Sequence, residues 1–258
     1  MLHWVESQSI LVITLLVFAF CYVLTMAIFG AATILSKRAV AKDLKATSPV
    51  TLTPLAVILA LLLAFLSSRV WTNVDRAGGY VGQEASALRQ AVLLAEALPT
   101  DVRTKLRESI KRHLHFIETQ DWPAMGKGEA NLQLIPAGLT DAMAAILSFT
   151  PAQPAQQLAQ ERALAAIEQA LETRRDRIRL SQLQIAPIQW AVIILLTMLI
   201  LITIAMIHID NRTAMAATML IFSTAVALCL VLLMAFDRPF AFGGVTMAPT
   251  TFREVAVE

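Results

Sequence analysis

Four long apolar stretches constrain this chain of 258 residues more than any other feature. They lie at about 9–35, 52–71, 189–208 and 214–236, and the only Asp, Glu, Lys or Arg within them is Arg69, near the end of the second. A helix needs roughly 20 such residues to cross a bilayer core about 30 Å thick. The whole sequence is 57% hydrophobic and 16% charged, whereas soluble domains are about 45–50% apolar and about 25% charged. We therefore predict four transmembrane helices and not a soluble cytosolic enzyme.

The first apolar stretch and the link between the last two each carry a further signal. The first stretch could be a signal peptide, but its flank MLHWVESQ has no Lys or Arg. Its apolar run is also far longer than a signal-peptide core, so we expect a retained helix. The third and fourth stretches are joined by the short polar link HIDNRT, which predicts a tight helical hairpin.

Most of the charge lies between the second and third stretches. Residues 72–187 contain 13 basic and 13 acidic residues, which together are 26 of the 40 charged residues. Apolar residues recur here at three- and four-residue steps, and no alternating strand pattern is present. This region is predicted to be a water-exposed helical domain, with helices near 72–98, 100–121, 130–149 and 155–184.

Local signals predict how these helices begin and end. Thr100 or Asp101 is the expected N-cap of the second helix, and Asp121-Trp122-Pro123 its expected end. The second span and the last domain helix are expected to leave the bilayer as unbroken rods, the latter through Pro187. Three glycines in the first domain helix predict the close approach of another helix: Gly78, Gly79 and Gly82.

These elements predict an all-α integral membrane protein with four transmembrane helices per subunit. A helical extramembrane domain is inserted between helices 2 and 3. The expected parts are 1–71 (transmembrane helices 1 and 2), 72–187 (soluble helical domain), 188–236 (transmembrane hairpin) and 237–258 (C-terminal tail). Four spans place both termini and the domain on one side. Basic residues flank the spans on both sides of the membrane. The loop near 36–50 carries four of them, and by the positive-inside rule this places the loop, and not the helical domain, in the cytoplasm: Lys37, Arg38, Lys42 and Lys45.

Signatures of catalysis are absent from the sequence. There is no GxSxG, HExxH, Walker or GxGxxG motif. His113 and His115 point in different directions on a helix, so they cannot share a metal, and we expect both to be solvated. Cys21 and Cys229 lie in apolar runs and form no CxxC motif. We therefore expect no catalytic residue, no metal site and no cofactor, and the net charge of +2 does not suggest nucleic-acid binding.

Polarity inside the predicted spans is mild. Pumps and proton-coupled transporters usually carry an ionisable residue in the membrane interior, which this chain lacks. The polar residues in the spans are candidates for hydrogen bonds between helices. They are Thr14, Cys21 and Thr25 in the first span, Thr197 and His208 in the third, and Ser223 and Thr224 in the fourth. The alternative is that such residues line a pore.

The second span is the better candidate for a pore lining. Ile58, Leu62 and Phe65 follow one another at steps of four and three on one helix face, and Ser68 and Arg69 come next. A ring of apolar side chains can gate a pore by dewetting, and arginines at its mouth attract anions. The alternative is that this stripe faces lipid or other helices and that Arg69 anchors the helix at the interface.

An arginine-rich segment, TRRDRIRL, precedes the third span. Arg174, Arg175 and Arg179 could bind anionic lipid headgroups at the membrane interface. The alternative is that this cluster pairs with Glu84 and Asp75 on a neighbouring helix.

Several short motifs occur together in a characteristic order. They are Trp71, Glu84-Ala85 with Leu88, Trp122-Pro123, the arginine-rich helix, and Asp237 with Pro239-Phe240. From the second span to the C-terminus, the chain resembles the bestrophin-like domain family. This is a prokaryotic and plant group that is distantly similar to bestrophin ion channels.

The resemblance implies a homo-oligomeric pore of five subunits that conducts anions, chloride among them, with its apolar constriction on the second span. It also implies a bacterial inner-membrane location, contact with membrane lipids, and a cytoplasmic helical domain and termini. Calcium-gated bestrophins carry an acidic cluster after the fourth span. Here AFGGVTMAP follows Phe240 and the first carboxylate is Glu254, so calcium gating of that kind is not expected.

A second function remains open at this point. The protein could be a non-conducting membrane scaffold or signalling protein whose helical domain binds a partner. An exposed Trp122 and the arginine cluster would serve that function.

Overall fold

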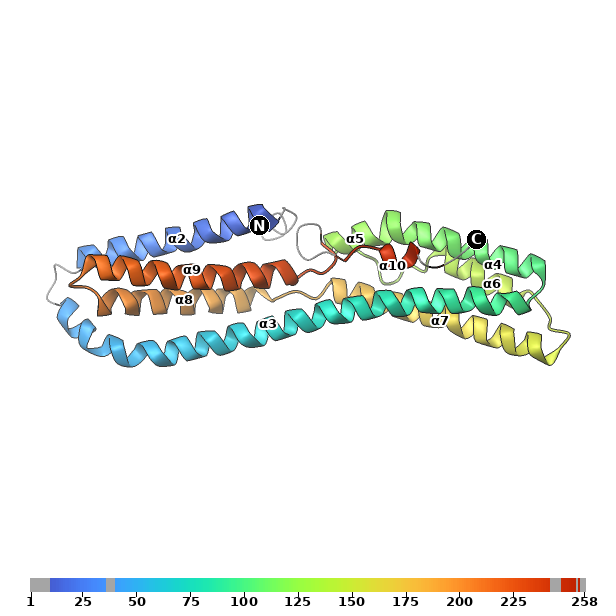
Figure 1. Cartoon of the computed structure of the whole chain (residues 1–258), viewed down its shortest axis with the longest axis horizontal. Coiled ribbons are helices and arrows are strands. Elements are labelled where there is room, and N and C mark those ends of the chain that lie inside the picture. The colour runs from blue at the N-terminus through green and yellow to red at the C-terminus, as the bar shows by residue number, and fades with distance from the viewer. Residues whose placement is uncertain (1–9, 36–39, 242–246, 254, 256–258) are drawn as a thin grey trace. The chain divides into compact units, whose positions relative to one another are not determined.

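The computed structural model describes residues 10–35, 40–241, 247–253 and 255, and it describes no side chain within 40–49. These residues form helices and loops without a strand, which confirms the all-α fold (Figure 1). The helices are α2 (Ile10–Leu35), α3 (Val40–Leu94), α4 (Thr100–Phe116), α5 (Trp122–Lys127), α6 (Ala137–Leu147), α7 (Pro154–Ser181), α8 (Pro187–Ile207), α9 (Arg212–Phe236) and α10 (Thr250–Arg253). A 3₁₀ turn, Ala95–Ala97, follows α3, and a π turn, Ile117–Asp121, joins α4 to α5.

Some sequence predictions concern residues outside this description. They are the flank before residue 10, Lys37, Arg38, the side chains of Lys42 and Lys45, the residues 242–246 of AFGGVTMAP, and Glu254.

The chain divides into two compact units. The membrane unit contains residues 1–72 and 184–237, and the helical unit contains residues 73–183 and 238–258. α3 contributes its first part to the membrane unit and its last part to the helical unit as one unbroken helix. This confirms the rod expected after the second span, although the helix already begins at Val40, within the expected loop.

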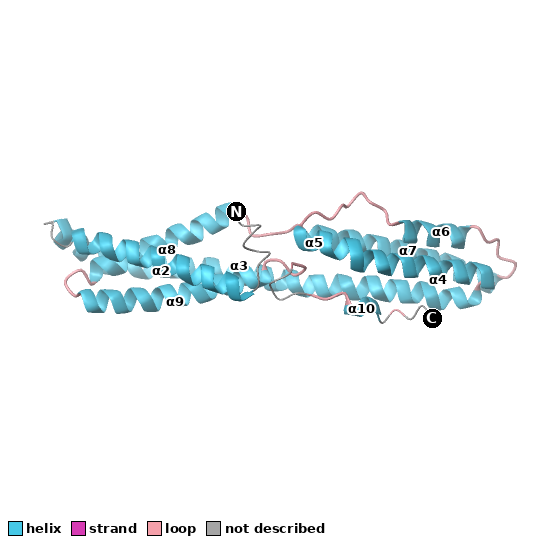
Figure 2. Ribbon diagram, turned by 90° about the horizontal axis from the view of Figure 1, so that it is seen from above, coloured by secondary structure: helices cyan, strands magenta, loops and turns pink. Residues whose placement is uncertain are grey.

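Four helical segments are long and apolar enough to cross a bilayer: Ile10–Leu35, Val50–Ala97, Pro187–Ile207 and Arg212–Phe236. The membrane unit contains three of them and the first part of Val50–Ala97. α2 packs against α8 and α9, which form the expected hairpin (Figure 2). The Thr25 and Ser223 hydroxyls lie 2.7 Å apart, and those of Tyr22 and Thr224 lie 3.1 Å apart. The predicted hydrogen bonds between helices are therefore present at Thr25, Ser223 and Thr224, and each contributes roughly 1 kcal/mol or less. Thr14 and Thr197 instead donate to carbonyls of their own helices.

The last domain helix does not continue into the third span. α7 ends at Ser181 and α8 begins at Pro187, so the prediction of an unbroken rod through Pro187 was wrong. The proline ring excludes the helical conformation from the preceding residue, and Ala186 is extended, with ψ 144°. The Ile185 amide in this connection donates to Asp237 Oδ1 at 3.0 Å, which ties the start of α8 to the end of α9.

The helical unit is built around the last part of α3. α4 packs on α6 and α6 packs on α7. Its core contains fully buried Leu88, Leu106, Leu139, Ile146 and Ile167. Each such side chain contributes about 1.5–3 kcal/mol by leaving water.

The second domain helix begins where it was predicted to begin, but its predicted N-cap and its predicted end were wrong. α4 begins at Thr100 with Pro99 in the N-cap position and no side-chain cap. At the other end the helix continues into α5, because the Trp122 amide donates to the Ile117 carbonyl five residues earlier. Pro123 has no N–H to offer to the carbonyl of Thr119, and the wider π turn lets the helix pass this point.

The closest contact of a glycine with a neighbouring helix is at Gly138, which was not predicted from the sequence. A Cβ atom there would lie 2.7 Å from the Ser109 carbonyl oxygen and 2.8 Å from the His113 amide nitrogen. The absence of a side chain therefore lets α6 contact the backbone of α4. Around Gly79 and Gly82 nothing in the described chain lies within 4 Å, so the expected helix is not found there. Gly78 faces only the Met247 side chain, at 3.2 Å.

Gly138→Ala should destabilise the helical unit by about 1–3 kcal/mol, because backbone atoms of α4 cannot yield to the added methyl group. Gly79→Ala is the matched control and should stabilise the helix by up to about 1 kcal/mol. Thermal unfolding of the purified proteins in detergent, followed by tryptophan fluorescence, measures both. An unchanged unfolding temperature for Gly138→Ala would contradict the close packing of α4 and α6.

Candidate functional site

The predicted pore-lining residues lie on an open face of α3 in the membrane unit. Ile58 is 51% exposed and Phe65 is 73% exposed. Leu61, at 53%, lies between them on the same face and was missed by the sequence analysis. Leu62 is half-buried and packs against the core of the membrane unit. Ser68 and Arg69 follow and are exposed, so the open apolar face ends at one polar and one cationic side chain.

α3 has the least covered span in the membrane unit. Only 11% of its apolar window is buried within the chain, compared with 44% for α8 and 39% for α9. Its covered side is formed by Leu59, Leu66 and Val70, which belong to the membrane core. The opposite side is left for lipid, another subunit or a pore.

The aromatic motifs lie at separate places. Trp71 is 59% exposed and stacks on Phe236, with ring centroids 5.3 Å apart. Trp122 meets Phe240 edge to face at 5.3 Å. The indole N–H of Trp122 also donates to the Met247 carbonyl at 3.2 Å. Trp122 is therefore only 6% exposed, and its expected exposure, which supported a partner-binding surface, was wrong.

A buried ion cluster lies in the helical unit. It consists of Glu84 on α3, His113 on α4, Asp121 in the π turn, and Arg174 and Arg177 on α7. Four of these side chains are fully buried and that of Asp121 is 4% exposed. We use the name ion cluster for these five residues.

The contacts in the ion cluster are short and directional. The Arg174 guanidinium donates through Nε and Nη2 to the two Asp121 oxygens, both at 2.7 Å. Its Nη1 donates to the Leu134 carbonyl at 2.9 Å. Arg177 Nε donates to Glu84 Oε2 at 2.8 Å, and its Nη2 lies 3.4 Å from Asp121 Oδ2. Arg177 therefore joins the carboxylates of α3 and the π turn.

Aromatic rings complete the surroundings of the two arginines. The Arg177 guanidinium carbon lies 5.5 Å from the Trp122 ring centroid and 5.6 Å from that of Phe252. That of Arg174 lies 5.9 Å from the Phe116 ring centroid. A cation over an aromatic face is attracted by the ring quadrupole, and this attraction is larger when water is excluded.

The electrostatics of the cluster favour an ionised Glu84. Burial alone raises the pKa of this carboxyl, but the charge of Arg177 and the hydrogen bond from His113 outweigh burial and hold the pKa below its ordinary value. His113 Nε2 lies 3.4 Å from Glu84 Oε1. Two arginines then balance two carboxylates among side chains that are closed to solvent.

The contacts of the ion cluster confirm one prediction made from the sequence and contradict two others. The alternative in which the arginine-rich segment pairs with Glu84 is correct, through Arg177. Arg174 cannot reach a lipid headgroup because it is fully buried on Asp121, so that prediction was wrong. The expected solvation of His113 was also wrong, because α6 and the cluster enclose it.

Arg175 is half-buried and Arg179 exposed, and for both the lipid-headgroup role stays a prediction. Arg179 pairs with Asp176 at 2.9 Å, one turn along α7. Within the described residues, Asp75 forms no ion pair with the arginines, and no group of three or more potential metal ligands is found.

The sequence model of the Bestrophin-like domain matches residues 19–250. The chain belongs to the bestrophin-like family. Among curated proteins, none matches it in sequence.

Solved structures of bestrophin homologues share the fold. A mutant of the bacterial bestrophin homologue from Klebsiella pneumoniae has a TM-score of 0.68 at 13% identity, covering 92% of this chain and 96% of its own. Another structure of that homologue, phased with zinc, has a TM-score of 0.66 at 12% identity, with coverages of 92% and 95%. The chain is thus a bestrophin-like, all-helical membrane protein.

Glu84→Gln should destabilise this bestrophin-like protein by roughly 3–5 kcal/mol, because it leaves a buried guanidinium without its carboxylate. Arg179→Gln, on α7, is the control. It removes only an exposed pair and should cost less than about 1 kcal/mol. Thermal unfolding at pH 7 compares the two variants with the wild type, and equal stability of Glu84→Gln and wild type would contradict the role of the cluster.

The effect of Glu84 should also depend on pH. Its folded-state pKa is depressed, so its stabilisation is complete above its unfolded pKa of about 4.3 and is lost as the pH falls through the folded value. The stability difference between wild type and Glu84→Gln should therefore be constant from pH 7 to about 5 and shrink at lower pH. Unfolding temperatures of both proteins across this range test it, and a difference that grows on acidification would contradict it.

Proposed function

We propose that the protein is a homo-oligomeric, anion-conducting channel whose constriction is formed by the open face of α3. The observation that carries this proposal is the combination of an uncovered apolar face at Ile58, Leu61 and Phe65 with Arg69 at its end. Membership of the bestrophin-like family supports it.

A single chain leaves most of the α3 span uncovered by other helices. Several copies arranged around an axis would therefore turn one side of α3 towards a common pathway. Apolar side chains there would close the pathway by dewetting, and a ring of Arg69 would attract anions to its mouth. We place five subunits around the axis and chloride among the permeant ions, following the resemblance to bestrophins.

Other parts of the proposal follow from the same comparison. The protein would lie in a bacterial inner membrane, in contact with its lipids, with the termini and helical unit in the cytoplasm. It would act as a channel and not as an enzyme. The alternative, a non-conducting scaffold that binds a partner, loses one of its two supports because Trp122 is buried.

The test is an ion-flux assay with the full chain reconstituted into liposomes. Wild-type protein should conduct chloride, and Leu61→Ala and Phe65→Ala should each raise the flux several-fold by widening the constriction. Ile221→Ala is the matched control, since Ile221 is 72% exposed on α9 and should leave the flux unchanged. Arg69→Gln should lower the permeability of chloride relative to sodium.

Two outcomes would reject the channel. One is no flux of chloride or of other anions and cations from well-folded protein. The other is an oligomer whose axis is filled by side chains or lipid, which would favour the scaffold instead.

A further inference from the structure

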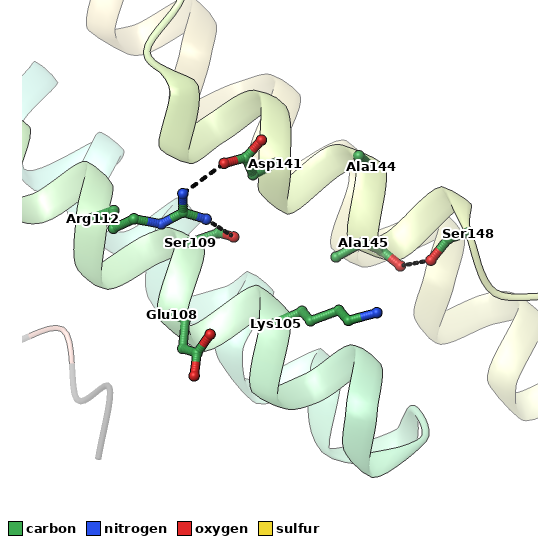
Figure 3. Close-up of a pocket in the computed structure, with 8 residues that line it drawn as sticks. All are labelled: Lys105, Glu108, Ser109, Arg112, Asp141, Ala144, Ala145 and Ser148. Atoms are coloured by element: carbon green, nitrogen blue, oxygen red, sulfur yellow. Dashed lines mark hydrogen bonds and ion pairs between the residues drawn. The ribbon is translucent and has the colours of Figure 1, made fainter.

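A surface groove of about 320 Å³ lies between α4 and α6 in the helical unit (Figure 3). Lys105, Ser109 and Arg112 line it from α4, at steps of four and three residues. Asp141 and Ser148 line it from the opposite side, with two alanines between them. The small alanine side chains leave room there for a ligand.

Arg112 is fixed at one end of the groove. Its Nη1 lies 2.8 Å from Asp141 Oδ2, and its Nη2 donates to the Ser109 hydroxyl at 3.1 Å. These two contacts use two of the five N–H groups of the guanidinium. Both partners of the Arg112–Asp141 pair are well exposed, so the pair is weak and leaves the cation able to interact with a further anion.

The Ser109 hydroxyl is an unusual donor at the base of the groove. Its residue is only 2% exposed. Other helical hydroxyls, such as those of Thr104 and Ser181, donate to a carbonyl of their own helix. The Ser109 oxygen instead accepts from Arg112 Nη2. A hydroxyl donates as well as accepts, so a ligand oxygen in the groove could receive a hydrogen bond from it.

Lys105 supplies an unpaired charge. Its ammonium has no ion-pair partner among the described residues, and its side chain extends along the groove (Figure 3). Glu108 points away from α6, on the other side of Lys105 (Figure 3). Its carboxylate and that of Asp141 both belong to the lining, so the groove carries two cations, two carboxylates and the Ser109 hydroxyl.

We propose that this groove binds a phosphate group. Lys105, Ser109 and Arg112 would each donate to a different oxygen of a tetrahedral anion, with the lysine as a point charge and the arginine as an oriented donor. The phosphate could belong to a soluble molecule or to a lipid headgroup, since the chemistry is shared. The site does not depend on ion conduction.

The test uses the purified full chain in detergent and inorganic phosphate as the probe. Calorimetric titration at constant ionic strength, with chloride as the balancing anion, should show saturable binding, and phosphate should raise the unfolding temperature. Lys105→Gln should weaken binding about tenfold, as expected for a lost charged hydrogen bond. Glu108→Gln should strengthen binding, because it removes a nearby negative charge. Lys111→Gln is the matched control, an exposed lysine of α4 outside the groove, and should bind as wild type does.

A competition experiment separates the two sources of phosphate. If dihexanoyl phosphatidic acid displaces inorganic phosphate at lower concentration than glycerol phosphate does, the ligand is a lipid headgroup. The reverse order assigns a soluble phosphate compound. Absence of saturable binding in the millimolar range would overturn the proposal, as would equal binding by Lys105→Gln and wild type. Lys105 is exposed, so its substitution leaves the fold intact and the result can be interpreted.

Discussion

Two arginine side chains without any contact with water constrain the helical unit more strictly than its apolar core does. An apolar contact tolerates small shifts along a helix, whereas a buried guanidinium must meet its acceptors in distance and direction. Arg174 and Arg177 lie three residues apart on α7 and meet carboxylates from α3 and the π turn. The axial positions of these three elements are therefore fixed together, and the segment after α9 closes over Arg177 with Phe252.

The features that sequence alone could predict are those that depend on one segment at a time. Uncharged apolar runs as long as α8 have few stable solutions other than a membrane span, so the bounds of three spans were predicted within a few residues. The second lies within the much longer helix α3. Pairing between Glu84 and the arginine-rich segment was one of two alternatives, because both charge signs fell on predicted helices. The sequence could not tell which arginine would turn inward.

The predictions that were wrong depend on partners distant in sequence. His113 is buried because Gly138 admits α6, and Trp122 is buried because Phe240 and Met247 return to cover it. Helix periodicity likewise predicted an apolar stripe on α3. It could not show which residues of that stripe other helices cover. Leu62 is packed against the membrane core and Leu61 is open, although the two are adjacent.

The π turn at Ile117–Asp121 has a consequence for how this sequence can change in length. A π turn holds one residue more than the α-helical turn it replaces. Loss of a single residue there would restore a regular α-helical turn and leave the direction of Asp121 nearly unchanged. Loss of a second residue would rotate Asp121 by roughly 100° relative to α4, and its carboxylate would then leave Arg174 unpaired in the interior. Family members that keep this pair are thus expected to have the present number of residues between His113 and Asp121 or one fewer.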